Sequence, residues 1–212
     1  MNSRLKTNSG IYLITPDHTD SGLLCAQVEL LLQQPIAFLQ YRNKAVNKAQ
    51  QREQASGLLT LCQKFKVPFI FNDNWQLAKE IGADGVHLGS EDAEPSWVRE
   101  QIGDKMLIGV SCYNSFERAQ AMAQLDIDYL AFGAMFSSST KPNAPRAELN
   151  LLTKAKTLNK AIVAIGGISP DNSTSIIEAG ADYLAVISSV FSSSNPERTL
   201  KLYLNSFKKV KS

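Results

Sequence analysis

The chain has 212 residues, of which 44% are hydrophobic and 20% charged, as is typical of a globular protein. This length is that of one domain, which we expect to span residues 1–212. The formal net charge of +2 gives no electrostatic reason to expect a nucleic-acid or membrane partner. No apolar run approaches the roughly 18 residues that a bilayer-spanning helix needs, and residues 1–10 lack the apolar core of a signal peptide.

The chain has three cysteines and two histidines, which limits the chemistry open to it. Cys25, Cys62 and Cys112 lie far apart without a CxxC spacing, a pattern typical of reduced thiols in the cytoplasm. We expect each to be a small buried apolar residue. His87 lies in the apolar stretch GVHLG and is expected to be packed and hydrogen-bonded, so neither a His-based triad nor a multi-histidine metal site is expected. Catalysis would then depend on carboxylates, cations and hydroxyls.

Short apolar or β-branched runs alternate with amphipathic stretches along the whole chain. The runs cover 10–16, 36–42, 67–73, 85–89, 106–111, 129–136, 161–167 and 183–190, and helical periodicity is clear over 21–34, 47–65 and 170–180. Such alternation predicts parallel strands joined by helical crossovers. Eight such units predict closure into a single (β/α)8 barrel, a TIM barrel with short loops, since the chain is lean for this fold.

The stretches IGADGVHLG and AGADYLAVI repeat one pattern, a helix end that runs through Gly-Ala-Asp into a strand. Asp84 and Asp182 then lie at the amino-terminal ends of strands, the floor of the barrel. We interpret both as turn and cap residues, not as catalytic groups.

Polar residues and glycines stand at the carboxyl ends of seven predicted strands, the ends from which barrel enzymes take their working groups. In chain order they are Gln40, Arg42 and Lys44; Asn72 and Asp73; Glu91 and Asp92; Ser111; Ser138, Thr140 and Lys141; Gly166 and Gly167; and Ser188 and Ser189. Because these ends meet at one mouth, we expect a single site there.

The residues at this mouth suit phosphorylated ligands. Arg42, Lys44 and Lys141 supply positive charge without acceptors, which suits phosphate oxygens. Asp73 and Asp92 supply two carboxylates, as is typical of Mg²⁺ shared with substrate phosphates. Backbone N–H groups of the glycine and serine turns after the last two strands would hold a second phosphate. The pattern indicates two phosphorylated substrates or a single long one.

Six motifs carry a resemblance to a known family. In order they are QYRNK (40–44), FNDNWQLA (71–78), GVHLGSED (85–92), IGVS (108–111), STK (139–141) and VAIGGI (163–168). Together they resemble the thiamin phosphate synthase family, also called thiamine-phosphate pyrophosphorylase, over nearly the whole chain. Such transferases join 4-amino-2-methyl-5-hydroxymethylpyrimidine diphosphate to 4-methyl-5-(2-hydroxyethyl)thiazole phosphate and release pyrophosphate and thiamin phosphate.

The resemblance implies roles for particular residues. The pyrimidine substrate and its pyrophosphate would be held by Gln40, Arg42, Lys44, Asn72, Ser111 and Lys141, with Lys141, Arg42 and Ser111 as catalytic residues. Asp73 and Asp92 would bind Mg²⁺, the expected cofactor. The thiazole phosphate would be surrounded by Ser138, Thr140, Gly167, Ile187 and Ser188. The C–O bond to pyrophosphate would break before the thiazole nitrogen attacks, so no protein nucleophile is required.

Some positions depart from the family pattern. Ser90 stands where a Gln is usual, Ser138 where a Thr is common, and Ala147 where a Gly is frequent. Residues 112–113, Cys-Tyr, replace a region that often bears His. None of these changes removes a charged group. The stretch 137–147 is longer than a minimal loop and is interpreted as a lid, with a flexible connector as the alternative.

Three alternatives accompany the synthase interpretation. A thiazole tautomerase of the same fold would not need the pyrophosphate-binding cations, and a non-catalytic sensor of a phosphorylated ligand would not need the metal carboxylates. A phosphosugar isomerase would need an acid–base pair that the sequence does not offer. The retained cations and carboxylates favour the synthase, with two small-molecule substrates. Homo-oligomerisation is left open by the sequence.

Overall fold

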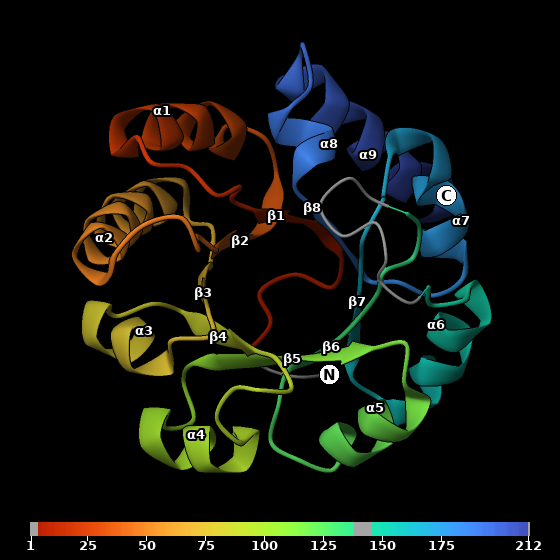
Figure 1. Ribbon diagram of the computed structural model, residues 1–212. Coiled ribbons are helices and arrows are strands. Elements are labelled where there is room, and N and C mark those ends of the chain that lie inside the picture. Colours follow the sequence, from red (N-terminus) through yellow and green to blue (C-terminus); the bar gives the residue numbers. More distant parts are fainter. Residues whose placement is uncertain (1–3, 138–145, 212) are drawn as a thin grey trace.

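The computed structural model describes residues 4–137 and 146–211. Within these residues eight parallel strands close into a barrel in which each strand pairs with its neighbours in sequence, and β1 pairs with β8 (Figure 1). The strands are β1 Gly10–Ile14, β2 Ile36–Tyr41, β3 Phe69–Asn72, β4 Gly85–Leu88, β5 Leu107–Tyr113, β6 Tyr129–Phe132, β7 Ala161–Ile165 and β8 Tyr183–Val186. The predicted TIM barrel is confirmed.

Helices surround this barrel on its outside (Figure 1). They are α1 Ser21–Leu32, α2 Lys48–Phe65, α3 Trp75–Ile81, α4 Pro95–Ile102, α5 Phe116–Ala123, α6 Leu149–Ala155, the 3₁₀ turn η1 Lys156–Leu158, α7 Pro170–Glu178, α8 Ser188–Phe191 and α9 Pro196–Lys211. Several begin at a residue whose side chain accepts a backbone N–H of the first turn, namely Asp20, Asn47, Asn74 and Ser115. Such caps accept hydrogen bonds from N–H groups that have no acceptor within the helix, and thereby fix where the helix starts.

Two strands, β6 and β8, are each four residues shorter than the sequence predicts. Past β8 (Tyr183–Val186), the N–H groups of Val190 and Phe191 both donate to the carbonyl of Ile187, each at 3.0 Å. The chain therefore turns into α8 where a strand was predicted. β6 likewise ends early, at Phe132. Both changes place loop or helix backbone, not strand, at the mouth.

The barrel interior is filled by a cluster of aromatic and aliphatic side chains that includes Tyr12, Phe38, Tyr129 and Tyr183. Tyr12 meets Phe38 with ring centroids 5.2 Å apart, and Phe38 meets Tyr183 at 5.0 Å, distances typical of favourable aromatic pairs. A second, larger core lies between the barrel and its helices. The barrel interior is thus a packed core, and the candidate active site lies at the carboxyl ends of its strands.

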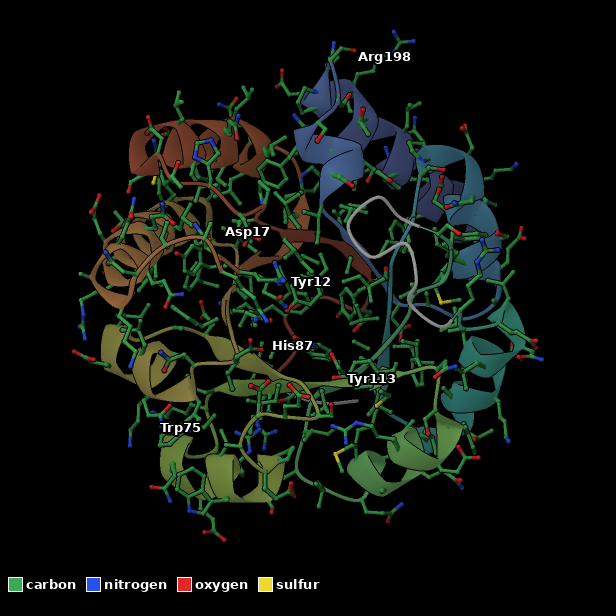
Figure 2. The ribbon with its side chains drawn as sticks, viewed as in Figure 1. Tyr12, Asp17, Trp75, His87, Tyr113 and Arg198 are labelled. Atoms are coloured by element: carbon green, nitrogen blue, oxygen red, sulfur yellow. The ribbon has the colours of Figure 1, made fainter. Side chains whose placement is uncertain are left out.

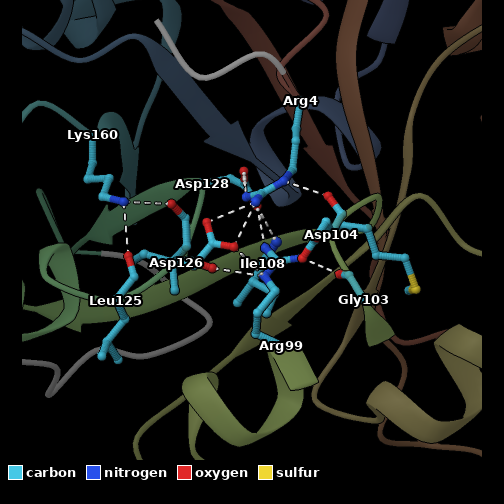
Figure 3. Close-up of polar contacts among 11 residues, drawn as sticks. Arg4, Arg99, Gly103, Asp104, Ile108, Leu125, Asp126, Asp128 and Lys160 are labelled. Atoms are coloured by element: carbon cyan, nitrogen blue, oxygen red, sulfur yellow. Dashed lines mark hydrogen bonds and ion pairs between the residues drawn. The ribbon is translucent and has the colours of Figure 1, made fainter. Parts of the chain in front are cut away.

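Charged residues close the barrel floor (Figure 3). The Asp128 carboxylate, fully buried, accepts from Arg4 Nη1 at 2.9 Å and from Arg99 Nη2 at 3.2 Å. Arg4 also pairs with Asp126 at 2.7 Å, and the N–H of Ile108 donates to Asp128 at 2.7 Å. Two further carboxylates each cap the strand next to their own: Asp84, just before β4, accepts the N–H of Phe69 in β3, and Asp182, just before β8, accepts the N–H of Ile162 in β7. The predicted structural role of Asp84 and Asp182 is confirmed.

No helix in the described part of the chain is long and apolar enough to cross a membrane.

Candidate active site

The end of β2 carries three of the predicted residues. Gln40 is 3% exposed and donates from Nε2 to the Tyr12 hydroxyl at 2.8 Å. The N–H of Arg42 donates to Thr15 Oγ1, which donates to the Arg42 carbonyl, both at 3.0 Å. This exchange ties the end of β2 to the end of β1, so the Arg42 backbone is fixed while its guanidinium reaches the mouth.

Asp17, which the sequence reasoning missed, orders the same region (Figure 2). Its Oδ1 accepts the N–H of Lys44 at 2.7 Å and lies 3.4 Å from Arg42 Nη1. The strand-end pattern could have identified it, because Asp17 directly follows the first predicted strand, just as the other candidate residues follow theirs. Asp17 therefore holds the Lys44 backbone and the Arg42 guanidinium on one side of the mouth.

The predicted metal residues lie side by side. Burial raises the pKa of Asp73 to about 6, aided by the negative charge and hydrogen bond of the Asp92 carboxyl, while Lys44 and Arg42 oppose the rise. Lys44 Nζ lies 3.9 Å from Asp73 Oδ2, and Asp92 Oδ2 accepts the Gly89 N–H at 2.6 Å. The neighbouring Asp92 carboxyl thus makes it more costly to ionise Asp73, and a cation placed between the two would offset that cost.

A small pocket of about 90 Å³ opens beside this pair. It is lined by Tyr41, Arg42, Asn43, Lys44, Gln51, Phe71, Asn72, Asp73 and Asn74. Four of the predicted residues, from two successive strand ends, thus face one hollow. Within the described ranges no group of three or more His, Cys, Asp or Glu residues is placed to hold a metal.

Ser111 of β5 is joined to His87 of β4. Their side chains lie 2.8 Å apart at Ser111 Oγ and His87 Nε2, and His87 Nδ1 lies 3.1 Å from the Tyr129 hydroxyl. Burial lowers the pKa of His87 to about 4, against the opposing charge of Asp92, so the ring is neutral near pH 7. The prediction that His87 is packed and hydrogen-bonded is confirmed.

Glycines at the end of β7 allow another loop to approach closely. Gly166 and Gly167 have φ of +99° and +62°, a region that residues with a Cβ rarely adopt. A Cβ on Gly167 would lie 2.5 Å from the carbonyl oxygen of Ser137. The glycine is therefore required by the close passage of the loop that follows β6.

The end of β8 presents Ser188 to solvent at the start of α8. Ile187 precedes it as the cap of this short helix. Ser189 instead forms a hydrogen bond with Tyr203 of α9 at 2.8 Å. Of the two serines, Ser188 is the one free to face a ligand, whereas Ser189 ties α8 to α9.

Two departures from the family pattern contact each other. The Tyr113 hydroxyl accepts the Ser90 N–H and lies 3.0 Å from Ser90 Oγ. Tyr113 is 42% exposed and lies at the rim of the barrel (Figure 2). The Ser and Tyr at these positions thus form a local pair that fixes the loop before Asp92.

The structure brings together Gln40, Arg42, Lys44, Asn72, Asp73, Asp92, Ser111, Gly167, Ile187 and Ser188 at the strand carboxyl ends. Ser138, Thr140 and Lys141 lie outside the described residues. Their predicted roles stay predictions.

A closed (β/α)8 barrel with cations, paired carboxylates and close-approach glycines at its mouth defines the class of TIM-barrel enzymes that act on phosphorylated small molecules. Residues 11–190 match the family model described as thiamine monophosphate synthase, and the chain belongs to this family.

Similar proteins are named as thiamine-phosphate synthases or pyrophosphorylases. A thiamine-phosphate synthase of Azoarcus sp. (strain BH72) is 51% identical over 188 residues, covering 88% of this chain and 91% of the relative. One from Xylella fastidiosa (strain 9a5c) is 48% identical, covering 93% of this chain and 84% of the relative. The structure of thiamine phosphate pyrophosphorylase from Pyrococcus furiosus is similar with a TM-score of 0.86 and 28% identity, covering 100% of both chains. The predicted family, enzyme class (a transferase) and synthase function are confirmed.

Proposed function

We propose that the chain condenses 4-amino-2-methyl-5-hydroxymethylpyrimidine diphosphate with 4-methyl-5-(2-hydroxyethyl)thiazole phosphate, releasing pyrophosphate and thiamin phosphate. The observation that carries the proposal is the arrangement of two donor-only cations, Arg42 and Lys44, beside the carboxyl pair Asp73 and Asp92. Such an arrangement suits a pyrophosphate held by cations on one side and by a carboxylate-bound metal on the other.

In the proposed reaction the C–O bond between the pyrimidine methylene and pyrophosphate breaks first. Its electron pair leaves with pyrophosphate, and the aminopyrimidine ring stabilises the methylene cation. The thiazole nitrogen then donates its lone pair to that carbon. Arg42, Lys44 and Lys141 would meet the charge that grows on the leaving group, which is where donors lower a barrier most.

Mg²⁺ is the proposed cofactor, bound by Asp73 and Asp92. The raised pKa of Asp73 supports this assignment, because a divalent cation would offset the repulsion between the two neighbouring carboxylates. When bound, the ion would neutralise part of the charge on pyrophosphate. The protein supplies few ligands, so substrate oxygens and water would complete the coordination.

The second substrate would lie on the other side of the mouth. We assign the thiazole phosphate to Gly167, Ile187 and Ser188, together with Ser138 and Thr140. The backbone turn at Gly167 and the exposed Ser188 support this assignment, because both offer N–H or O–H donors to phosphate. Ser111 and Gln40 would hold the pyrimidine ring between the two phosphate regions.

The test is direct. Purified protein is mixed with both substrates and Mg²⁺, and thiamin phosphate and pyrophosphate are quantified together. Equal amounts of both products are expected. No product at saturating substrate would overturn the proposal, and pyrophosphate without thiamin phosphate would reveal hydrolysis instead of condensation.

We also propose that the reaction takes place in the cytoplasm. The free thiols of Cys25, Cys62 and Cys112 support this location, because reduced cysteines are typical of that compartment. Sedimentation of the purified protein would show whether the chain also forms a homo-oligomer.

A further inference from the structure

A chain of buried and partly buried hydrogen bonds crosses the barrel beneath the mouth. Gln40 Nε2 lies 2.8 Å from the Tyr12 hydroxyl, and the hydroxyls of Tyr12 and Tyr129 lie 2.6 Å apart. Tyr129 continues to His87 at 3.1 Å, and His87 continues to Ser111 at 2.8 Å. The five residues come from five strands, and Tyr12 and His87 lie inside the ring of strands (Figure 2).

The direction of every bond follows from the first. The Gln40 amide nitrogen donates to Tyr12, so the single hydroxyl hydrogen of Tyr12 is left for Tyr129. Tyr129 in turn donates to His87 Nδ1. A neutral imidazole has one proton, which must then lie on Nε2 and point to Ser111 Oγ. Ser111 accepts this bond and keeps its own hydrogen.

The protonation states needed for this chain fit its surroundings. Both ring nitrogens of His87 face hydroxyls, Nδ1 that of Tyr129 at 3.1 Å and Nε2 that of Ser111 at 2.8 Å, an arrangement that suits a neutral imidazole with one proton. Burial raises the pKa of both Tyr12 and Tyr129 well above that of an exposed tyrosine, so both hydroxyls keep their hydrogens. Tyr12, Tyr129 and His87 therefore each carry the single hydrogen that this order of donors and acceptors requires.

We propose that Tyr12, Tyr129 and His87 are positioning residues that commit the Ser111 hydroxyl to donate to the pyrimidine substrate. The inference rests on the proposed function, in which Ser111 and Gln40 hold that substrate. The partner of Ser111 is then an acceptor atom, a ring nitrogen or a pyrophosphate oxygen. The Gln40 carbonyl Oε1, which takes no part in the chain, is the acceptor for the 4-amino group. One donor and one acceptor match an aminopyrimidine, which presents an N–H beside a ring nitrogen.

The opposite polarity makes a different prediction. If Gln40 accepted from Tyr12, every bond would reverse, Ser111 would donate to His87, and the imidazole proton would lie on Nδ1. Ser111 would then offer only an acceptor to the substrate. The tautomer of His87 therefore reports the direction of the whole chain.

The first experiment reads that tautomer by ¹⁵N NMR of the ligand-free protein at pH 7. The chain has two histidines, so a His18→Gln variant leaves the His87 signals alone. Coupling of the ring proton to Nε2 is expected. A proton on Nδ1 would overturn the proposal, and this result does not depend on whether the protein makes thiamin phosphate.

The second experiment measures steady-state kinetics of matched tyrosine variants. Tyr129→Phe should lower kcat/KM for the pyrimidine diphosphate about tenfold, the scale of one lost hydrogen bond, and should leave KM for the thiazole phosphate unchanged. Tyr12→Phe removes the bond from which the direction of the chain follows, so it should lower the same kcat/KM by a similar factor of about ten. Tyr183→Phe is the control, because its hydroxyl donates to the Thr7 carbonyl in the same aromatic core but outside the chain.

The third experiment tests rescue at position 87. His87→Gln offers an amide N–H to Ser111 and a carbonyl to Tyr129, so it should retain most activity, whereas His87→Phe should not. Equal loss in both variants, or equal kinetics of Tyr129→Phe and Tyr183→Phe in an active enzyme, would overturn the positioning role. A wild-type protein that forms no thiamin phosphate would instead overturn the proposed function.

Discussion

Asp73 lies between two opposing influences at the mouth of the barrel. Burial and the neighbouring Asp92 favour its protonated form, while Lys44 and Arg42 favour its carboxylate. Its backbone has φ +64°, a region that Asp tolerates better than most residues, and its N–H donates to the His87 carbonyl at 2.9 Å. The fixed backbone and the cost of ionising the Asp73 carboxyl together indicate a side chain that is positioned to bind a cation.

We expect Mg²⁺ to bind the free protein weakly and pyrophosphate to tighten it, because the ion requires six oxygens and the carboxyl pair supplies few. Linkage requires Mg²⁺ to tighten pyrophosphate by the same factor. Calorimetric titration of each, alone and with the other, measures this factor. Asp92→Asn should remove most of the coupling and still accept the Gly89 N–H.

Glu91→Gln is the control for this measurement. It removes the same charge from an exposed neighbouring residue and should preserve the coupling. Tight Mg²⁺ binding to the bare protein, or unchanged coupling in Asp92→Asn, would place the metal elsewhere.

At the scale of the element, β5 shows how a strand makes room for the buried chain. Gly109 lies in β5 opposite Tyr129, and a Cβ there would lie 1.8 Å from Tyr129 Cζ. The tyrosine ring cannot move aside easily, because Tyr12, Phe38 and His87 surround it. The missing side chain in β5 therefore fixes the position of the ring that links β1 to β4.

Gly109→Ala should lower the free energy of unfolding by about 1–3 kcal/mol, the usual cost of overpacking a core. A double-mutant cycle with Tyr129→Leu isolates the cause, because the smaller side chain leaves space for the Cβ. Urea unfolding of the four proteins measures each step. The cost of Gly109→Ala should shrink in the Tyr129→Leu background, and an unchanged cost would show that the ring is not responsible.

The short helix α8 should determine binding of the second phosphate. Ser188→Asp places a carboxylate beside the proposed thiazole phosphate and should weaken that ligand more than tenfold, with little change for the pyrimidine diphosphate. Separate binding titrations compare the two. Ser194→Asp adds the same charge at an exposed position beyond α8 and should change neither. Equal weakening of both ligands by Ser188→Asp would mean that the two phosphate regions are misassigned.

At the scale of the whole molecule, the segment before β1 locks the floor beneath β5 and β6. Arg4 bonds Asp126 and the buried Asp128, and donates from Nε to the Asp104 carbonyl at 2.7 Å (Figure 3). These contacts join residues about a hundred positions apart in the chain. The residues of the floor therefore stabilise the fold, whereas those of the mouth form the candidate active site.

Arg4→Met should lower the free energy of unfolding by about 2 kcal/mol at pH 7, the scale of charged hydrogen bonds lost. The Arg4 hydrogen bond holds the pKa of Asp126 below its ordinary value of 3.8. A lowered folded pKa means that this carboxylate stabilises the fold above about pH 3.8 and ceases to do so as pH falls through the lowered value. The difference between wild type and Arg4→Met should therefore shrink in strong acid.

Denaturant unfolding from pH 7 to pH 2 measures this difference. Lys6→Met is the control and should change the stability little, since within the described ranges the ion pair of Lys6 is an exposed one with Asp84 at 3.9 Å. A gap between wild type and Arg4→Met that is constant over the whole range would exclude Asp126 as its source.

The alternation of apolar runs with amphipathic stretches determined the barrel and its strand order, because period two and period 3.6 are local properties of the chain. The strand-end rule then placed Gln40, Arg42, Asp73 and Ser111 at the mouth, since parallel strands bring their carboxyl ends to one side. The caps at Asp84 and Asp182 were also readable, because they repeat within one local pattern.

Only the tertiary structure decided how these residues meet. The approach of Asp73 to Asp92 and the place of Asp17 beside Arg42 both depend on contacts between segments that are distant in the sequence. The chain from Gln40 to Ser111 is the clearest case, since its members come from five strands and no local spacing relates them. Local periodicity fixes which face a side chain takes, whereas its partner is fixed by the closure of the barrel.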